Sequence, residues 1–398
     1  MKKIAFVTTG FMGTILPLAR AFINDDFCVD IYILTADVLK PQEALSDLHW
    51  KTKIGVNKVP GDYYESINDF INTQKLCFYT IRLPRPYERV HLLNRVMSRY
   101  RDMMIKKAAS VINRKEYNLI NIIAVYTNVD IISFCRYLNG AKIVSLHEVC
   151  NHLKPDFSSC PPVINYLANN KIPIALFSRK SKNDILRYPN SSLLDIYMTR
   201  FGTMDSYSAF LYNDPPIVSH KYFLFFGNIL PYKGIDVFID ACQKVQDKLN
   251  EFHFVIAGAG YDESINKIKN NDHFTLINTY LTNRDLANLI RNCYAVVCPH
   301  KTASQSGIPQ TTFAFNKPII VSRIESFEDI VVDKFNGVVF DKYSSESLAL
   351  SIEELATDVT LYNKIVFNIK QFTRFMPQYD WNNIERGYIE YMNKNTNR

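Results

Sequence analysis

Short apolar runs alternate with amphipathic stretches along the first half of the chain. The runs are rich in β-branched residues and end in polar ones, so they predict strands at residues 4–8, 29–34, 119–125, 142–146 and 174–177. A helix is expected at residues 14–24, between the first two strands. This order of strand, helix and strand implies a parallel sheet with helices on both faces. Ligands of such a sheet bind at the carboxyl ends of its strands.

The pattern breaks at residues 212–218, where Asn213-Asp214 and two prolines cannot continue a strand or a helix. It restarts with strands expected at residues 222–226, 253–257, 274–277, 295–298 and 318–321. Helices are expected at residues 235–249 and 285–292. We therefore place a domain boundary between residues 214 and 215. The predicted fold class is α/β, with two parallel sheets that face each other across a cleft.

Length and composition agree with two globular domains. The chain has 398 residues, more than the ~250–300 at which single cores stop growing. Its eight cysteines form no C-x-x-C pair, so a reduced, cytoplasmic setting is expected. The opening apolar run meets Gly10 and is interpreted as a strand and not as a signal peptide. No apolar run reaches the ~18 residues of a membrane span.

One group of residues could in principle surround a metal ion: His147, Cys150, His152 and Cys160. Their spacing matches no familiar tetrahedral zinc pattern. We interpret them as ordinary loop and core residues, and we expect no metal site.

The net charge of +7 is concentrated in one segment. Ten basic and three acidic residues lie between Arg82 and Tyr117, so the rest of the chain is balanced. After Pro86 this segment is predicted to be a basic amphipathic helix. The apolar side of the helix is expected to hold Val90, Leu93, Met97, Tyr100, Met104, Ala108 and Val111.

Two interpretations of this helix stay open. It could bind an anionic membrane through Arg95, Arg99, Lys106 and Lys107, or it could be the solvated outer helix of an α/β domain. Nucleic-acid binding is disfavoured, because the chain carries no other nucleic-acid-binding signature.

The sharpest motif follows the first strand of the second domain: Phe225-Phe-Gly-Asn-Ile-Leu-Pro-Tyr-Lys-Gly-Ile-Asp236. It resembles the G-R-x(4)-K-G segment of retaining GT-B glycosyltransferases of the glycosyltransferase 4 family, the group 1 type. The resemblance covers roughly residues 220–355. It includes Phe254-Val-Ile-Ala-Gly-Ala-Gly260, Val297-Cys-Pro299, Asn316-Lys-Pro-Ile-Ile-Val-Ser322 and Asn336-Gly-Val-Val-Phe340. In the first half it is limited to the opening strand, the glycine turn and Ser145-Leu-His-Glu148.

The resemblance implies the GT-B architecture, in which two Rossmann-like domains face each other. Residues 1–214 would bind the acceptor, and residues 215–375 would bind a nucleotide-sugar donor. Residues 376–398 resemble the closing helix that crosses back to the first domain. The two halves are expected to move about residues 213–218 and 376–380. The family is metal-independent, so neither a metal nor a cofactor is expected.

The resemblance also implies a donor site in the second domain. Lys233 would stabilise the charge that develops on the diphosphate leaving group. The family's arginine is Asn228 here, so Lys233 would carry more of that role. The expected donor-binding residues are Gly227, Asn228, Lys233, Gly258, Gly260, Gln305, Ser306, Gly307, Gln310, Thr311, Arg323 and Glu328.

His147 is similar to the histidine that faces the cleft from the first domain in this family. It could hydrogen-bond a donor hydroxyl or transfer a proton near neutral pH, or it could be structural. With Lys233 it is the expected catalytic residue. Gly10, Gly13 and Thr14 are expected to contact the acceptor, although a tight turn between strand and helix explains the glycines equally well.

Residues 303–322 depart from the family pattern because they contain no carboxylate. The two glutamates of the family's E-x7-E region fall at Ser304 and at Thr311 or Thr312. Hydrogen bonds to ionised groups are about twice as strong as neutral ones, so the loss matters. The pocket either binds a different sugar through amides and hydroxyls or no longer catalyses. The compact Gly307-Ile-Pro309 turn favours the first explanation.

The sequence therefore predicts a cytoplasmic, retaining, metal-independent glycosyltransferase. It would move a sugar from a nucleotide-sugar donor to a glycan or lipid-linked acceptor in bacterial surface polysaccharide biosynthesis, such as capsule or O-antigen. If the acceptor is lipid-linked, the basic helix would dock on the inner face of the cell membrane. The alternative is a non-catalytic GT-B subunit that binds a sugar nucleotide or a catalytic partner. A hydrolysing epimerase is less favoured, because that chemistry would need carboxylates in the cleft.

Overall fold

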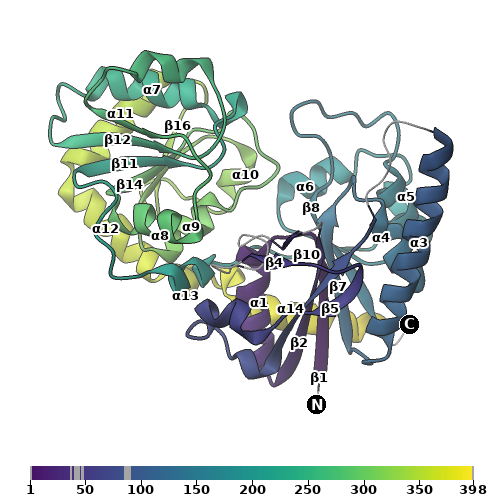
Figure 1. Cartoon of the computed structure of the whole chain (residues 1–398). Helices are drawn as coiled ribbons and strands as arrows, with labels where there is room; N and C mark the ends of the chain where they lie inside the picture. The colour runs from purple at the N-terminus through teal and green to yellow at the C-terminus, as the bar shows by residue number, and fades with distance from the viewer. Residues whose placement is uncertain (1, 36–37, 40–44, 46–48, 85–90, 397–398) are drawn as a thin grey trace.

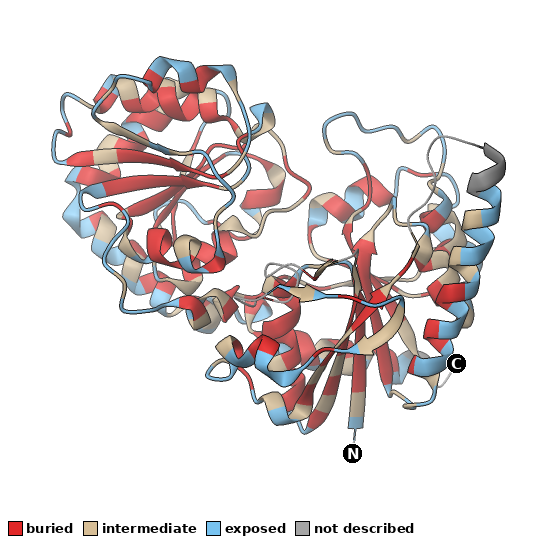
Figure 2. Ribbon diagram, viewed as in Figure 1, coloured by how far each residue is buried: buried red, intermediate tan, exposed pale blue. Residues whose placement is uncertain are grey.

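The structure is a computed structural model that describes residues 2–35, 38–39, 45, 49–84 and 91–396, and of residues 91–94 and 395–396 only the backbone. The chain forms two α/β lobes, one purple to blue and one green to yellow in Figure 1, and each is built on a mainly parallel sheet. The strands are largely buried, whereas the outer faces of the helices are exposed (Figure 2). The predicted fold class is confirmed.

Among the described residues, the N-terminal sheet has eight strands in the order β10-β9-β8-β7-β1-β2-β6-β5. These are β1 (Lys2–Thr8), β2 (Phe27–Thr35), β5 (Gly55–Lys58), β6 (Leu76–Arg82), β7 (Leu119–Val125), β8 (Lys142–Glu148), β9 (Ile174–Leu176) and β10 (Ile196–Met198). The strands β3 (Val38–Leu39) and β4 (Trp50–Lys51) form a separate pair. The helices are α1 (Met12–Asn24), α3 (His91–Asn113), α4 (Asp130–Tyr137), α5 (Pro162–Asn169) and α6 (Arg179–Ile185).

The C-terminal sheet has six parallel strands in the order β13-β12-β11-β14-β15-β16 within the described part of the chain. These are β11 (Lys221–Phe226), β12 (Phe252–Ala257), β13 (Phe274–Ile277), β14 (Ala295–Cys298), β15 (Ile319–Ser322) and β16 (Val338–Phe340). The helices are α7 (Ile235–Val245), α8 (Asn283–Asn292), α9 (Ile308–Ala314), α10 (Glu325–Glu328), α11 (Ser345–Thr357), α12 (Val359–Lys370), α13 (Phe372–Phe375) and α14 (Trp381–Thr396).

Each sheet has a point at which the strand order changes direction. In the N-terminal sheet this point lies between β1 and β7, and in the C-terminal sheet it lies between β11 and β14. In open α/β sheets, ligands bind in the crevice beyond the carboxyl ends of the strands at such a point. The topology therefore marks the residues that follow β1, β7, β11 and β14 as candidates for a site.

Helix α14 lies against the N-terminal lobe, although it follows the C-terminal lobe in sequence. Its buried residues Trp381, Ile384 and Tyr388 belong to the same apolar cluster as α1. The Trp381 indole donates a hydrogen bond to the Thr203 carbonyl at 2.7 Å. The chain therefore returns to its first lobe at its end. The exact boundaries after residues 214 and 375 stay a prediction.

Helix α3 is present, but its predicted apolar side is partly wrong. Tyr100 and Val111 are each 40% exposed. The predicted Met104 and Ala108 are buried, and the helix also buries Ile105, Ala109 and Ile112. Spacings of three and four residues fit two neighbouring stripes of this helix, and the buried face contains residues of both. Val90 and the side chain of Leu93 lie outside the described residues.

No helix within the described ranges is long and apolar enough to cross a membrane.

Candidate functional site

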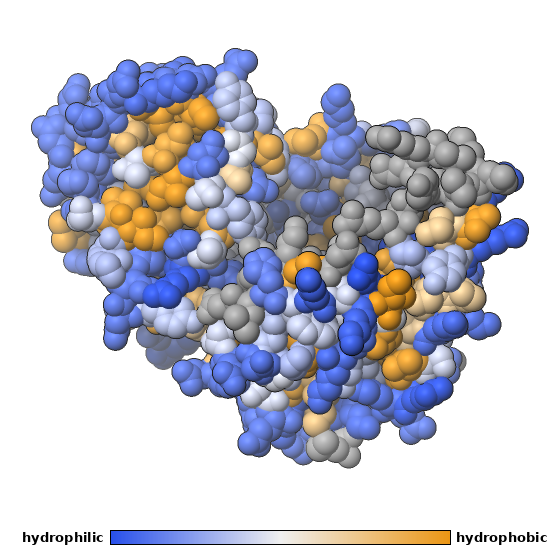
Figure 3. All heavy atoms as spheres, viewed as in Figure 1, coloured by the Kyte–Doolittle hydropathy of each residue, from blue (hydrophilic) through white to orange (hydrophobic). Residues whose placement is uncertain are grey.

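Two adjoining cavities lie between the lobes, where the surface is notched in Figure 3. Each has a volume of about 370 Å³. The first, here called the lysine cavity, is lined by Glu148, His152, Met204, Tyr207, Phe226, Gly227, Tyr232, Lys233, Leu286, Ala303, Ser304, Gln305, Ser306, Gly307, Ile308 and Thr311. The second, here called the aromatic cavity, is lined by Phe11, Gly13, Thr14, Val125, His147, Glu148, Phe201, Met204, Tyr207, Gln305, Ser306 and Gly307.

The two cavities bring together residues from both lobes. They share a wall that holds Glu148 and Tyr207 from the N-terminal half and Gln305, Ser306 and Gly307 from the C-terminal half. The aromatic cavity borders the crevice after β1 and β7, and the lysine cavity borders the crevice after β11 and β14. One ligand could therefore contact both crevices.

Many of the residues expected from the sequence line these cavities. Gly227, Lys233 and Thr311 line the lysine cavity. His147, Gly13 and Thr14 line the aromatic cavity. The remaining expected residues in the linings are on the shared wall: Gln305, Ser306 and Gly307.

Other expected residues line neither cavity. Asn228 and Glu328 are exposed. Arg323 pairs with Asp341 at 3.5 Å. Gln310 is buried behind the turn, where its carbonyl accepts a hydrogen bond from the Met204 amide at 3.2 Å. These four residues, and Gly10 after β1, lie outside the cavity walls.

Gly258 and Gly260 also lie outside the walls, and the structure explains why glycine is needed there. Gly258 has φ of +149°, and a Cβ on it would lie 1.9 Å from the Gly227 carbonyl oxygen. A Cβ on Gly260 would lie 2.3 Å from the Ile229 carbonyl oxygen. The end of β12 therefore runs against the loop after β11 and holds that loop in place.

Lys233 reaches the lysine cavity from a short 3-10 turn, η5 (Pro231–Lys233), between β11 and α7. The next residue, Gly234, has φ of +72°, and a Cβ there would lie 2.0 Å from the Pro299 carbonyl oxygen. Burial lowers the pKa of Lys233. No carboxylate of the described residues forms an ion pair with its ammonium group. A cation without a counter-ion in a cavity is a suitable partner for an anionic ligand.

His147 forms part of an aromatic stack. Its ring lies 3.8 Å from the Phe11 ring and 4.9 Å from the Phe201 ring, measured between centroids. Burial lowers the pKa of His147 to about 3, so the imidazole is neutral at pH 7. Proton transfer near neutral pH is therefore disfavoured. The buried Nε2 atom has no hydrogen-bond partner among the described residues and could still bond a ligand hydroxyl.

Several cavity residues were not expected from the sequence. His152 and Tyr232 line the lysine cavity from opposite lobes, and their rings lie 5.2 Å apart. Tyr207 and Glu148 are on the shared wall. Glu148 had one signal in the sequence, because it directly follows His147 at the end of a strand. The others sit in irregular segments that carry no periodic pattern.

Direct bonds join the lobes beside the cavities. The Gln305 side-chain amide donates to the His147 carbonyl. The Ser178 hydroxyl donates to the Ser304 carbonyl at 3.1 Å. Arg179 forms an ion pair with Asp329 where α6 faces α10 in Figure 1. The described conformation therefore holds the two walls of the site together.

The residues considered as metal ligands do not form a site. Cys150 is buried, and its thiol lies 3.6 Å from an Asp184 carboxylate oxygen. Within the described ranges, no group of three or more His, Cys, Asp or Glu side chains is arranged to hold a metal ion.

The basic residues of α3 are far from the cavities. Arg95, Arg99, Lys106 and Lys107 are exposed. In Figure 1, α3 lies at the outer edge of the N-terminal lobe, on the side away from the C-terminal lobe.

Comparison with known proteins gives a family match for one lobe. Residues 214–372 match the family model described as glycosyl transferases group 1. A curated relative, the uncharacterized glycosyltransferase MJ1178 of Methanocaldococcus jannaschii, is 29% identical over 168 residues, which are 41% of this chain and 45% of the relative. A second, MJ1607 of the same organism, is 25% identical over 42% of this chain and 43% of its own length. The match thus spans less than half of each relative.

Solved structures match the chain over almost its whole length. HepE of Anabaena, solved in complex with UDP and glucose, matches with a TM-score of 0.66 at 14% identity. The match covers 99% of this chain and 100% of the HepE chain. Sucrose-phosphate synthase of Thermosynechococcus elongatus has a TM-score of 0.64 at 12% identity, with 99% of both chains covered. The chain therefore has the GT-B fold, and its residues 214–372 are similar in sequence to group 1 glycosyl transferases.

Proposed function

We propose that this protein is a glycosyltransferase whose donor is a nucleotide sugar. The observation that carries the proposal is Lys233, which has no ion-pair partner among the described residues and lines a cavity where the C-terminal sheet changes strand order. A diphosphate there would accept a charge-assisted hydrogen bond from the ammonium group. The ammonium group would also stabilise the negative charge that develops on the diphosphate as it leaves the sugar. HepE, which shares the fold, was solved with UDP-glucose. This supports a nucleotide sugar as donor.

The finer parts of the proposal rest on the resemblance of residues 220–355 to retaining enzymes. We propose transfer with retention, to a glycan or lipid-linked acceptor that enters the aromatic cavity. We propose that no metal ion is needed, because Lys233 supplies positive charge at the diphosphate. Surface polysaccharide assembly in the cytoplasm is the proposed setting.

The alternative is a non-catalytic subunit that binds a sugar nucleotide. The positions of the two missing glutamates favour it, since Ser304 and Thr311 bring no charge to the lysine cavity. The Thr311 hydroxyl is already bonded to the Gly307 carbonyl at 2.9 Å. Both alternatives predict nucleotide binding, and they differ in turnover.

Calorimetric titration with UDP, GDP and ADP tests the site. Lys233→Ala should bind the tightest-binding of these nucleotides at least tenfold more weakly, because hydrogen bonds to charged groups contribute about 1.5–3 kcal/mol. Lys269→Ala is the matched control, since Lys269 is an exposed lysine of the same lobe outside both cavities. Equal affinities for the Lys233→Ala variant and the wild type would remove Lys233 from the site.

We also propose that α3 binds an anionic membrane surface. Exposed apolar residues, Val96, Tyr100, Met103 and Val111, alternate along α3 with its exposed bases. Apolar and basic groups on one exposed face are what interfacial helices use.

Sedimentation with phosphatidylglycerol vesicles tests this contact. Replacing Arg95, Arg99, Lys106 and Lys107 by Gln should reduce binding more than tenfold, since each base near an anionic surface contributes about 1 kcal/mol. The charge-matched control replaces four exposed lysines of the other lobe: Lys269, Lys342, Lys364 and Lys370. If both variants sediment alike, α3 is a solvated face.

A further inference from the structure

The stretch that lacks the two glutamates faces a carboxylate from the other lobe. Among the described residues, Glu148 is the one acidic residue that lines either cavity, and it lines both. Its side chain forms no hydrogen bond or ion pair with any described residue. A carboxylate accepts strong hydrogen bonds from hydroxyl groups, and here that capacity is unused.

The backbone explains how Glu148 reaches this position. In a regular strand, consecutive side chains point to opposite faces, so His147 and Glu148 could not line one cavity. The pairing of β7 with β8 is irregular at this point: Ala124 pairs with Leu146, and Val125 pairs with Glu148. His147 is therefore the extra residue of a β-bulge, which redirects the side chains after it. The Glu148 carbonyl accepts the Tyr126 amide at 3.0 Å, which fixes the end of the strand.

The surroundings of Glu148 suit a sugar. Gln305 and Ser306 lie on the same shared wall. The Gln305 side-chain nitrogen is bonded to the His147 carbonyl, but its side-chain oxygen has no partner among the described residues and can accept a bond from a sugar hydroxyl, as can the Ser306 hydroxyl. Lys233 lines the same lysine cavity but does not pair with Glu148. A nucleotide sugar with its diphosphate at Lys233 would thus reach Glu148 with its sugar.

We propose that Glu148 binds hydroxyl groups of the donor sugar and supplies the negative charge that Ser304 and Thr311 lack. The inference rests on the proposed function, because it assumes that the diphosphate lies at Lys233. The carboxylate of the sugar subsite would then come from the end of β8 in the N-terminal lobe and not from the C-terminal lobe. The sugar subsite is then complete only when both lobes contact the sugar, as the bonds between the lobes allow in the described conformation.

Calorimetry on Glu148→Gln separates the sugar from the diphosphate. The probes are the nucleotide sugar that the wild type binds most tightly, from UDP-, GDP- and ADP-sugars, and its nucleoside diphosphate. Glu148→Gln should bind the nucleotide sugar roughly tenfold more weakly, because a charged acceptor is lost. It should bind the diphosphate as tightly as the wild type, or more tightly, because a negative charge near the ligand is removed. Glu65→Gln, an exposed acid of the same lobe, should change neither affinity.

Further comparisons keep the inference falsifiable. Glu148→Asp retains the charge and should bind the nucleotide sugar with intermediate affinity. A deoxy-sugar donor that lacks the bonded hydroxyl should lose affinity for the wild type and not for Glu148→Gln. Equal weakening of both probes would mean that Glu148 only shapes the cavity, and no change in either would also overturn the inference. A wild type that binds no nucleotide would instead overturn the proposed function.

Discussion

Two charged residues of the lysine cavity, Lys233 and Glu148, indicate what kind of ligand binds there. Lys233 and Glu148 come from different lobes and line one cavity without pairing to each other. Charged groups that are partly buried are costly unless something satisfies them. Neither side chain forms a hydrogen bond or an ion pair with a described residue, although the Lys233 ammonium group lies over the Tyr232 ring at 5.1 Å from its centroid. The site is therefore arranged for a ligand that carries both negative charge and hydroxyl groups.

His147 shows how burial limits chemistry at the same place. Its ring is stacked between aromatic side chains, and burial holds its pKa at about 3. It would be charged only below that pH. The residue can position a hydroxyl through Nε2, but an acid role near neutral pH would need water or a ligand to change its surroundings.

Among the elements, α14 carries a group that should make stability depend on pH. Glu385 is 2% exposed, and burial together with nearby Asp25 raises its pKa from 4.5 to about 7, against the opposing effect of Arg386 and Lys2. The raised pKa means that the stabilising state is protonated. Its contribution is complete below pH 4.5, falls as the pH rises, and is lost above about 7.

Glu385→Gln removes this titration. Relative to the wild type, the variant should gain about 2 kcal/mol between pH 5 and pH 8, as linkage at 1.36 kcal/mol per pKa unit implies. Denaturant unfolding of α14 and its lobe, followed at several pH values, measures the gain. Glu390→Gln, on an exposed position of the same helix, is the control and should show no such trend. Parallel pH profiles for Glu385→Gln and the wild type would contradict the assignment.

The elements also show what the sequence can and cannot predict. Strands such as β1, β8 and β12 were predicted because buried parallel strands are continuous apolar runs. The exposed side of α3 was mispredicted at Tyr100 and Val111, since helical spacing alone does not say which stripe meets the sheet. The sequence shows that Glu148 follows His147 at the end of a strand. Its position on the cavity wall depends on a β-bulge, which a single sequence does not predict.

The sequence predicted some of the residues that line the cavities but could not distinguish the roles of the predicted residues. Gly227 and Lys233 were predicted by motif, and both line the lysine cavity. Gly258 and Gly260 belong to the same resemblance, but they are needed because the end of β12 packs directly against the backbone of the loop after β11. Motif matching cannot separate these two reasons for a glycine, because both require the same small residue.

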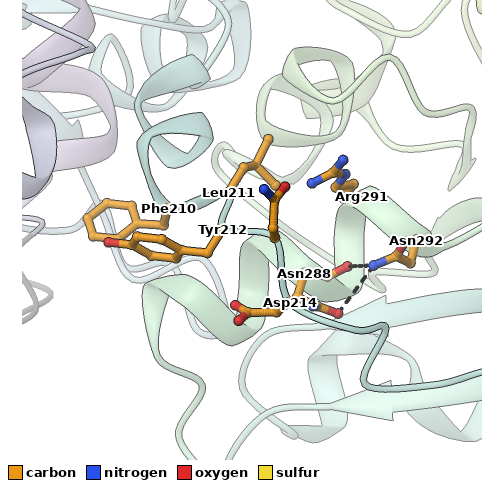
Figure 4. Close-up of a pocket in the computed structure, with 8 residues that line it drawn as sticks. Phe210, Leu211, Tyr212, Asp214, Asn288, Arg291 and Asn292 are labelled. Atoms are coloured by element: carbon orange, nitrogen blue, oxygen red, sulfur yellow. Dashed lines mark hydrogen bonds between the residues drawn. The ribbon is translucent and has the colours of Figure 1, made fainter.

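At the scale of the whole molecule, the linker between the lobes is held by the C-terminal lobe. Asn288 of α8 accepts the Ile217 amide and donates to the Pro215 carbonyl, each at 3.0 Å. Arg284 of the same helix pairs with Asp214. These contacts restrict the expected movement about residues 213–218. The preceding residues Phe210 to Asp214 line a pocket of about 270 Å³ together with Asn288, Arg291 and Asn292 (Figure 4).

The arrangement of the two lobes matters for the proposed transfer, because transfer requires both lobes to meet around the sugar. Ser178, Arg179 and Gln305 bond across the cleft in the described conformation. If that conformation is the reactive one, water is kept from the sugar while the acceptor reaches it through the aromatic cavity.

The most direct test is to follow the wild-type protein by proton NMR with its tightest nucleotide sugar and a bacterial lipid and glycan extract. We expect release of nucleoside diphosphate together with a new glycosidic signal of the same anomeric configuration as the donor. Tight binding of the nucleotide sugar without release of nucleoside diphosphate in any extract would contradict transfer and leave a non-catalytic subunit.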